Sequence, residues 1–516
     1  MNIKHIYSTF YLIVALAAIS LSGCYNDFGS DNFKSIDEVK ITFTTFMSDS
    51  LVLSAGDSLK LHPHVEYTGD TTNLSYEWKI FNTSLEKDPI SGEYPSASVV
   101  SIDKNLLYKV AQGPGQYMLV YTITDKKTGV KTYYEIYVTV ETVKGLVVLD
   151  RQSDLSNEIH VIRDNRILLN TVANSKEGVV YNLFSGSNQG QKLSGAKSIY
   201  RGVYRVSESF VFSDDIYVFG DSLSLKLDPS NYHVRSNSIY DFFVVAPPSY
   251  NLQAQVMPKS HCELITIDGR IYCYSRIMIG NTKFGIDIAP SDNYSAAPFL
   301  PYIPVSGVQF GSVIFDKTNH SFRPIDQFGS SLLNLSDTIT KPFDMKKIDM
   351  NLRYMENGNL NYTYSIFQDA NDANKPYLLA ANFAVVTGVK PKPIYKINLS
   401  ALPDINNAVD YTFSTKGHVF FYATPSAVYS ATYRDGKSIK AFTPSAGEIV
   451  TKIKIFKDEY NATYDGKLLF ITTQNAGTGE GKIYIVQFNG VNGVVDLSTM
   501  KSYGGFAEIL QTSLNN

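Results

Sequence analysis

Basic residues are not in excess in this sequence, and tryptophan is almost absent from it. The 516 residues include 46 Lys and Arg against 49 Asp and Glu, which gives a net charge of −3 at pH 7. Without a basic surface the chain has no electrostatic basis for binding nucleic acid. Trp78 is the single tryptophan, whereas there are 36 Tyr and 29 Phe. A Tyr-rich chain punctuated by Gly favours strands, so we expect an all-β protein.

Long apolar runs are also missing, apart from one near the N-terminus. Tyr11 to Leu21 reads YLIVALAAISL and follows the basic side chains of Lys4 and His5. The run is too short to cross a bilayer as a helix, and its position predicts a secretory signal peptide over residues 1–23.

The next residues, Leu21-Ser22-Gly23-Cys24, match the lipobox of bacterial lipoproteins. This resemblance implies that the thiol of Cys24 is diacylated, that the signal is cut before it, and that the new amino group is acylated. Several acyl chains give stable anchoring where one chain is marginal. The alternative is a soluble secreted protein with a chance cysteine. Since no second apolar run follows, lipid is the only membrane attachment that we predict.

Residues 24–35 form the expected lipidated tether. The sequence YNDFGSDNFKS after Cys24 is polar, contains Gly and Ser, and lacks periodicity. It predicts a flexible segment. Asp27 and Asp31 resemble the acidic export signals that send some Gram-negative lipoproteins to the cell surface. We therefore expect an outer-membrane, lipid-anchored protein exposed on the cell surface.

Cys262 and Cys273 are the only other cysteines, and they flank the hairpin HCELITIDGRIYCY. A two-residue turn at Asp268-Gly269 places Leu264 opposite Cys273 and makes Cys262 a diagonal neighbour. Diagonal neighbours lie about 7–8 Å apart, beyond the usual reach of a disulfide. We expect two buried thiols, with a disulfide left open if the turn differs. We expect no metal here, because His261 points to the other face.

Residues 36–143 have the pattern of a small β-sandwich. Ala55 to Tyr67 alternates apolar and polar side chains, and residues 113–140 form two strands joined by a polar turn at Asp125 to Gly129. One face of a further strand carries Leu74, Tyr76, Trp78 and Ile80. A buried Trp opposite alternating strands is typical of immunoglobulin-like sandwiches.

This region resembles a PKD domain, a spacer or binding module. The resemblance rests on Tyr76-x-Trp78, on Pro114-Gly115-x-Tyr117 and on the strand end Thr122 to Asp125. The sequence KIFNTS stands where the family has an Asp-Phe-Gly-Asp-Gly run, so the match is to a divergent, PKD-like form. His62 and His64 share a strand face there, but Pro63 between them and the lack of a third ligand favour a solvated face.

Residues 145–516 repeat one theme, a short apolar strand, a turn and a second strand. Seven such units give a spacing of about 53 residues, close to the ~40–50 residues of a four-stranded propeller blade. They are Lys144–Arg163, Ser209–Pro229, Cys262–Ile277, Ser312–Ile325, Asn361–Phe383, His418–Phe442 and Lys467–Asn489. Stacking such units radially buries both faces of each and leaves few edges exposed. We predict a roughly seven-bladed β-propeller, with a second sandwich pair or a β-helix as the rival.

The whole chain resembles lipoproteins of the PKD-like family. The shared features are the lipobox, the divergent PKD domain, the opening strand Gly145 to Leu149, and Gly504-Gly505-Phe506 near the end of the propeller. Such proteins are typically encoded beside SusC/SusD-type, TonB-dependent importers of glycans or peptides. The resemblance implies a surface accessory of nutrient capture with that transporter complex as its partner.

Motifs of catalysis are absent from the sequence. There is no Gly-x-Ser-x-Gly or His-Glu-x-x-His motif. GTGEGK at Gly477 to Lys482 has the wrong spacing for a phosphate loop, and DANDAN at Asp369 to Asn374 lacks the glycine and closing Glu of a calcium loop. With no Trp after Trp78, no Ser-x-Asp-x-Gly-x-Thr-Trp box of sialidase propellers is complete. We therefore predict no catalytic residue, metal or cofactor, and the sequence does not identify the ligand-binding residues.

Two functions remain open. One is a non-catalytic surface accessory of an importer that binds peptide or oligosaccharide. The other is a propeller-type glycoside hydrolase or lyase, which needs two inward carboxylates that the sequence cannot place. Because sugar platforms use flat aromatics, Trp above all, the lack of Trp in the propeller leans towards peptide.

Overall fold

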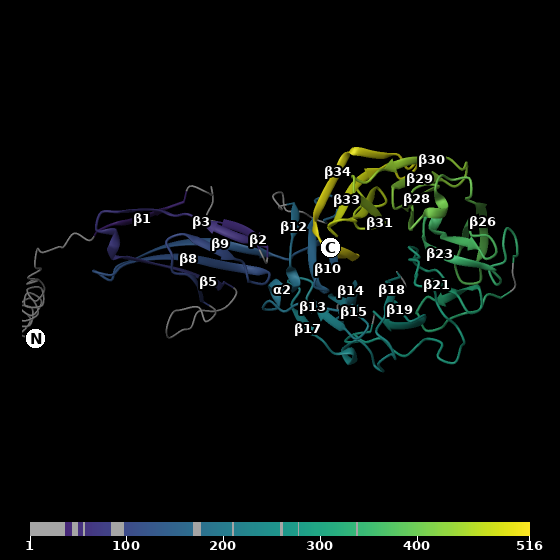
Figure 1. Cartoon of the computed structure of the whole chain (residues 1–516). Helices are drawn as coiled ribbons and strands as arrows, with labels where there is room; N and C mark the ends of the chain where they lie inside the picture. Colours follow the sequence, from purple (N-terminus) through teal and green to yellow (C-terminus); the bar gives the residue numbers. More distant parts are fainter. Residues whose placement is uncertain are drawn as a thin grey trace, which may run out of the picture.

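The computed structural model of the chain describes residues 37–43, 50–54, 57–83, 97–168, 177–208, 211–258, 262–276, 278–336 and 339–515. The predicted signal peptide, Cys24, the tether and His261 lie outside these ranges. An elongated N-terminal domain joins the side of a ring-shaped domain (Figure 1). No helix in the described residues is long and apolar enough to cross a membrane.

Helical structure in the described residues is confined to short segments. They are α2 (Leu183–Ser187) and the 3-10 turns η1 (Thr71–Asn73), η2 (Ile239–Asp241), η3 (Asn359–Asn361) and η4 (Ile405–Asn407). Strands form all the remaining regular structure of the described ranges, so the predicted all-β class is confirmed.

The N-terminal domain is the expected sandwich. Its strands are β1 (Val39–Thr42), β2 (Ser50–Ser54), β3 (Ser58–Leu61), β4 (His64–Tyr67), β5 (Leu74–Asn82), β6 (Ser98–Ser101), β7 (Leu106–Lys109), β8 (Gly115–Asp125) and β9 (Lys131–Glu141). One sheet has the order β2-β9-β8-β5-β6, in which β2 is parallel to β9. The pairs β1-β4 and β3-β7 complete the domain.

Trp78 lies at the centre of the sandwich core. Its side chain is fully buried, and its ring stacks on Tyr121 with centroids 4.2 Å apart. The indole Nε1 donates a hydrogen bond to the carbonyl of Asp103 at 3.0 Å, so burial leaves this polar atom satisfied. Leu59 and Leu61 enter the same core from β3, as the alternating pattern predicts.

The ring is a β-propeller, and its described residues form seven sheets. Blade 1 contains β10 (Gly145–Arg151), β11 (Ser156–Arg163), β12 (Gly178–Val180), β13 (Leu193–Ser194) and β35 (Glu508–Asn515). Blade 2 contains β14 (Ala196–Arg205), β15 (Phe212–Gly220), β16 (Ser224–Leu227) and β17 (Val234–Ser236). Blade 3 contains β18 (Leu252–Val256), β19 (Cys262–Ile267) and β20 (Arg270–Ser275), and blade 4 contains β21 (Phe310–Asp316) and β22 (Ser321–Asp326).

The last three blades have four strands each. Blade 5 contains β23 (Met350–Asn357), β24 (Thr363–Asp369), β25 (Pro376–Asn382) and β26 (Lys392–Asn398); blade 6 contains β27 (Asp410–Phe413), β28 (Val419–Thr424), β29 (Ala427–Thr432) and β30 (Ser438–Phe442); blade 7 contains β31 (Glu448–Ile455), β32 (Leu468–Asn475), β33 (Gly481–Phe488) and β34 (Val495–Phe506). Each predicted repeat unit contains the central hairpin of one blade.

Continuous apolar runs in these hairpins follow from burial on both faces. In β10, Val147 and Leu149 pack with blade 2, while Leu146 and Val148 pack with blade 7. Comparable clusters lie between every consecutive pair of blades in the described chain. A strand buried on both faces reads as a run of Val, Leu and Ile, which is why GLVVL does not alternate.

The ring closes through its first and last strands. The C-terminal strand β35 pairs antiparallel with β10, and Gly145 lies opposite Asn515. The amide of Asn515 donates to the carbonyls of Val143 and Pro229, at 3.2 and 2.7 Å, and to the hydroxyl of Tyr232. The two ends of the propeller sequence are therefore held by a ladder and by a buried polar side chain.

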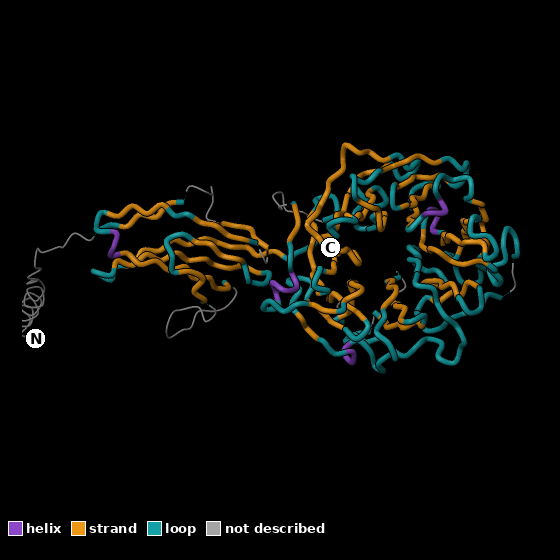
Figure 2. The backbone as a smooth tube through the Cα atoms, viewed as in Figure 1, coloured by secondary structure: helices purple, strands orange, loops and turns teal. Residues whose placement is uncertain are grey.

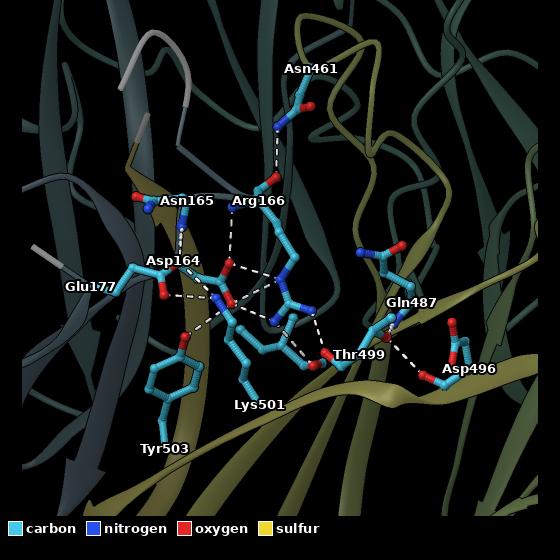
Figure 3. A network of polar contacts seen from close by, with 11 residues as sticks. Asp164, Asn165, Arg166, Glu177, Asn461, Gln487, Asp496, Thr499, Lys501 and Tyr503 are labelled. Atoms are coloured by element: carbon cyan, nitrogen blue, oxygen red, sulfur yellow. Dashed lines mark hydrogen bonds and ion pairs between the residues drawn. The ribbon is translucent and has the colours of Figure 1, made fainter. Parts of the chain in front are cut away.

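A second buried network joins blades 1 and 7 (Figure 3). Arg166 pairs with Asp164 at 2.6 Å, and Tyr503 on β34 donates a hydrogen bond to the same carboxylate. The guanidinium also donates to the carbonyls of Thr499 and Ile485 in blade 7. Because each charge has a partner and little exposure, the network is structural.

The cysteine hairpin has the predicted register. Leu264 lies opposite Cys273, and Cys262 lies opposite Ser275. Neither Cys262 nor Cys273 forms a disulfide, as expected for diagonal neighbours. The expectation of two buried thiols was wrong for Cys273, which is partly exposed. It stands on β20, the edge strand of the described sheet, whereas Cys262 stands on β19 between β18 and β20. The hydrogen bond with Cys262 and burial raise the pKa of the Cys273 thiol.

Candidate functional site

A cavity of about 770 Å³ opens on one face of the propeller. Because neighbouring strands are antiparallel, the link from the first to the second strand of a blade and the link from the third to the fourth lie at the same face. Segments of blades 2, 3 and 4 and the link after β31 in blade 7 meet there. We call this site the Arg276 cavity.

The lining of the Arg276 cavity is mixed. Its charged and hydroxyl-bearing residues are Arg201, Arg276, Ser306 and Glu459. Its apolar and aromatic residues are Val203, Phe212, Met257, Pro258, Tyr302 and Tyr460.

The sheets are arranged around a central axis (Figure 2), and the residues that line the cavity come from blades on different sides of this axis. The hydroxyl of Tyr302, which precedes β21 in blade 4, lies 3.5 Å from the carboxylate of Glu459, which follows β31 in blade 7. These blades are not neighbours in the ring, so their contact crosses the axis. Lys457, in the same link, pairs with Glu356 of blade 5 at 2.7 Å.

Arg201 is a neutralised cation of this site. Its Nε and terminal nitrogen lie 2.7 and 2.6 Å from one oxygen of Asp214 on the adjacent strand. The backbone carbonyl of Arg201 also accepts a hydrogen bond from Gln255 at 2.9 Å. The pair positions the cavity wall and leaves little net charge there.

Arg276 follows directly after β20 and retains an unsatisfied hydrogen-bond donor. Its Nε is buried and has no hydrogen-bond partner among the described residues. The guanidinium carbon lies 6.0 Å from the centroid of the Phe212 ring, within the range of a weak cation–π contact. A buried donor without a partner costs free energy, and an incoming acceptor removes that cost.

Glu263 lies behind the cavity wall with no exposed surface. Its carboxylate accepts hydrogen bonds from the hydroxyl of Tyr274 at 2.7 Å and from the backbone of Val203 at 3.4 Å. Burial raises its pKa from 4.5 to about 7, although the hydrogen bonds and the charge of Arg276 oppose the shift. The carboxyl group of Glu263 near Arg276 is therefore only partly ionised at neutral pH.

Tyrosines form the outer part of the site. Burial and the nearby carboxylate of Glu459 raise the pKa of Tyr302, so its hydroxyl stays protonated and donates. Tyr460 is 79 % exposed and stands at the rim. Trp78, the only Trp of the sequence, is in the sandwich core and takes no part.

The motifs weighed in the sequence lie elsewhere. GTGEGK begins in the turn between β32 and β33 and ends in β33, and DANDAN joins β24 to β25, so both belong to hairpin turns. His62 and His64 are exposed, and His64 lies 3.5 Å from Glu66. The described residues contain no group of three His, Cys, Asp or Glu side chains placed to hold a metal.

A buried histidine and aspartate do lie together in blade 1. Nε2 of His160 is 3.1 Å from Asp150, and both side chains are buried. The imidazole packs against Tyr181 and Phe506, and Asp150 accepts the backbone N–H of Ala507 at 2.8 Å. The pair anchors the Gly504-Gly505-Phe506 stretch and has no access to a substrate.

Sequence reasoning did not find Arg276, Arg201 or Glu459. Each stands alone among ordinary strand or loop residues, with no motif around it. Only the ring brings them to one cavity. The sequence signal for Arg276 was only that an arginine follows an apolar hairpin strand. Many solvent-exposed arginines stand in the same kind of position.

The sequence model of the PKD-like family matches residues 24–195, a range that contains the sandwich and reaches the start of blade 2. A search of curated proteins gave no match. Among solved structures, a quinonprotein alcohol dehydrogenase-like protein from Bacteroides thetaiotaomicron is 13% identical, with 93% of this chain and 99% of that chain covered and a TM-score of 0.43.

Two further structures are similar at a lower level. Dihydro-heme d1 dehydrogenase NirN is 8% identical, with 75% of this chain and 71% of that chain covered and a TM-score of 0.34. Hsv2 of Kluyveromyces lactis is 9% identical, with 72% of this chain and 100% of that chain covered and the same TM-score of 0.34. The assignment of the propeller rests on the strand pairing described above.

Proposed function

We propose that this chain is a non-catalytic, lipid-anchored protein of the cell surface that binds a nutrient peptide or glycan at the Arg276 cavity. The observation that carries the proposal is the cavity itself. It is placed where blades converge, it has the volume of a small-molecule site, and it combines apolar walls with a few polar groups. Loops on a rigid scaffold are common places for recognition.

The proposed location rests on the N-terminal sequence. The lipobox ends at Cys24, and the match to the PKD-like family begins at the same residue. The sequence after Cys24 predicts a tether of about ten residues, which would reach roughly 20 Å as a random coil. This reach suits a protein that works beside a SusC/SusD-type, TonB-dependent importer in the outer membrane, which we propose as its partner.

The lining of the cavity favours binding over hydrolysis. Glycoside hydrolases use two carboxyl groups that flank the scissile bond. Glu459 is the single carboxylate among the described residues of the lining. Glu263 is nearby but fully buried and held by hydrogen bonds, so it has no path to a substrate.

The test uses the intact lipoprotein, extracted from its own outer membrane in a mild detergent. We expect a SusC/SusD-type pair to co-purify with it, and we expect panels of oligosaccharides and peptides to yield binding without release of reducing ends or new amino groups. Turnover that disappears in Glu459→Gln would establish the hydrolase or lyase instead. Recovery of the protein without a transporter would refute the partner.

A further inference from the structure

We infer that the Arg276 cavity recognises a short peptide through a carboxylate, which pairs with the guanidinium of Arg276 while an apolar side chain packs on the adjacent wall. This inference deepens the proposed function and rests on it. It commits to one ligand class, whereas the proposed function admits peptide and glycan.

The charge of the site favours an anionic group. Arg201 is satisfied by Asp214, so it has little capacity for a ligand. Arg276 retains a buried donor without a partner among the described residues. An arginine fork binds a carboxylate through two parallel hydrogen bonds, and these charge-assisted bonds are stronger than neutral ones.

The walls beside Arg276 favour an apolar side chain over a sugar ring. Phe212, Met257 and Pro258 line this part of the cavity. Phe212 is 44% exposed, so its ring already faces open space beside the guanidinium. Met adapts its shape to varied apolar groups, and the described lining contains no Trp, the aromatic that sugar platforms use above all.

The opposite wall carries the other sign of charge. Glu459 contributes a carboxylate to the lining, and the Tyr302 hydroxyl lies 3.5 Å from it. A free peptide has an ammonium as well as a carboxylate, so its two ends match the two signs of charge in the lining. A polyuronate has only negative charge and gains nothing from Glu459. The volume of about 770 Å³ lies within the range that holds drug-sized ligands, which includes small peptides.

The experiment compares two tripeptide libraries of the same composition, one with free C-termini and one amidated. The full-length lipoprotein in detergent is equilibrated with each, retained peptides are identified by mass spectrometry, and affinities are measured by calorimetry. We expect free-acid peptides with an apolar residue to be retained about 10- to 100-fold more tightly than their amides. Amidated peptides that contain Asp or Glu distinguish a side-chain carboxylate from the C-terminal one.

Three variants locate the interaction. Arg276→Gln should lower the affinity for carboxylate peptides by about the same 10- to 100-fold and leave amides without Asp or Glu unaffected. Arg434→Gln removes an exposed arginine outside the cavity and should change nothing. Ser306→Trp fills the cavity from an exposed loop position without touching a charge and should also abolish binding. This variant tests the site if Arg276→Gln fails to fold.

The outcomes separate the two proposals. Equal binding of acids and of amides that lack Asp and Glu, or wild-type affinity in both cavity variants, overturns the carboxylate inference and leaves a binding protein. Arg276-dependent binding of oligogalacturonate without any peptide binding overturns the peptide assignment alone. Hydrolysis of the bound peptides overturns the non-catalytic function while the role of Arg276 stands.

Discussion

Gly145 and Asn515 lie opposite each other at the point where the propeller closes. Gly145 begins the first strand of the ring, and Asn515 ends the last. The φ of Gly145 is +146°, a backbone conformation that residues with side chains rarely adopt. A Cβ at Gly145 would lie 2.1 Å from the carbonyl oxygen of Ile162. The backbone of β11 thus packs directly against this residue, which explains a glycine at the start of the strand.

Gly145→Ala should weaken the closure of the ring. Backbone strain of about 1–3 kcal/mol adds to a clash with β11 that cannot relax without moving the strand, so we expect a loss of more than about 3 kcal/mol in the free energy of unfolding. The measurement is urea denaturation of the propeller followed by circular dichroism.

Gly178→Ala is the matched control in the same blade. Gly178 has a similar φ of +137°, but a Cβ there would meet nothing within 4 Å. It should show the backbone strain alone, about 1–3 kcal/mol. Equal losses in the two variants would refute the packing explanation.

Glu263 should make stability depend on pH. Burial raises its pKa in the folded protein from 4.5 to about 7, so between these values the folded state holds a proton that the unfolded state has lost. The contribution of Glu263 to stability is therefore undiminished below pH 4.5 and falls as pH rises towards 7. The shift corresponds to about 3 kcal/mol by linkage.

Glu263→Gln removes this titration. Between pH 4 and pH 8 the wild-type protein should lose about 3 kcal/mol more of its free energy of unfolding than the variant does. Glu135→Gln, which removes an exposed carboxylate on β9, should keep the wild-type profile. Parallel pH profiles for the wild type and Glu263→Gln would show that Glu263 does not titrate in this window.

Cys24→Ala tests the anchor. The thiol accepts the diacylglycerol in the proposed processing, so the variant should retain its signal peptide, take up no radiolabelled fatty acid and leave the surface-exposed fraction. Palmitate labelling and protease shaving of whole cells measure both properties. Wild-type distribution of the unlabelled variant would contradict a lipid anchor.

The propeller should fold without the sandwich. The sandwich core contains residues from the N-terminal domain alone, and the propeller clusters begin at Val143. A side-chain contact between the domains, Arg163 to Asp57, is an ion pair at 3.6 Å. We expect limited proteolysis to release a stable fragment close to residues 145–516 that unfolds cooperatively. A fragment that precipitates or loses its strand signal would show that the domains form one cooperative unit.

The sequence by itself determined the local units of this protein. Each blade contains a hairpin whose two strands are adjacent in the chain, as in β19 and β20 around Asp268-Gly269, so turn chemistry and apolar runs are enough to locate it. Trp78 and the alternation in β3 predicted the sandwich for the same reason. The register of the cysteine hairpin followed from its two-residue turn.

Only the tertiary structure decided how the ring closes and where a ligand can bind. The pairing of β10 with β35 joins the two ends of the propeller sequence, and no local pattern specifies such a partner. Arg276, Tyr302 and Glu459 come from blades 3, 4 and 7, so their meeting depends on the curvature of the whole ring. Whether an arginine is neutralised, as Arg201 is, or left with an unpaired donor, as Arg276 is, depends on neighbours that the fold supplies.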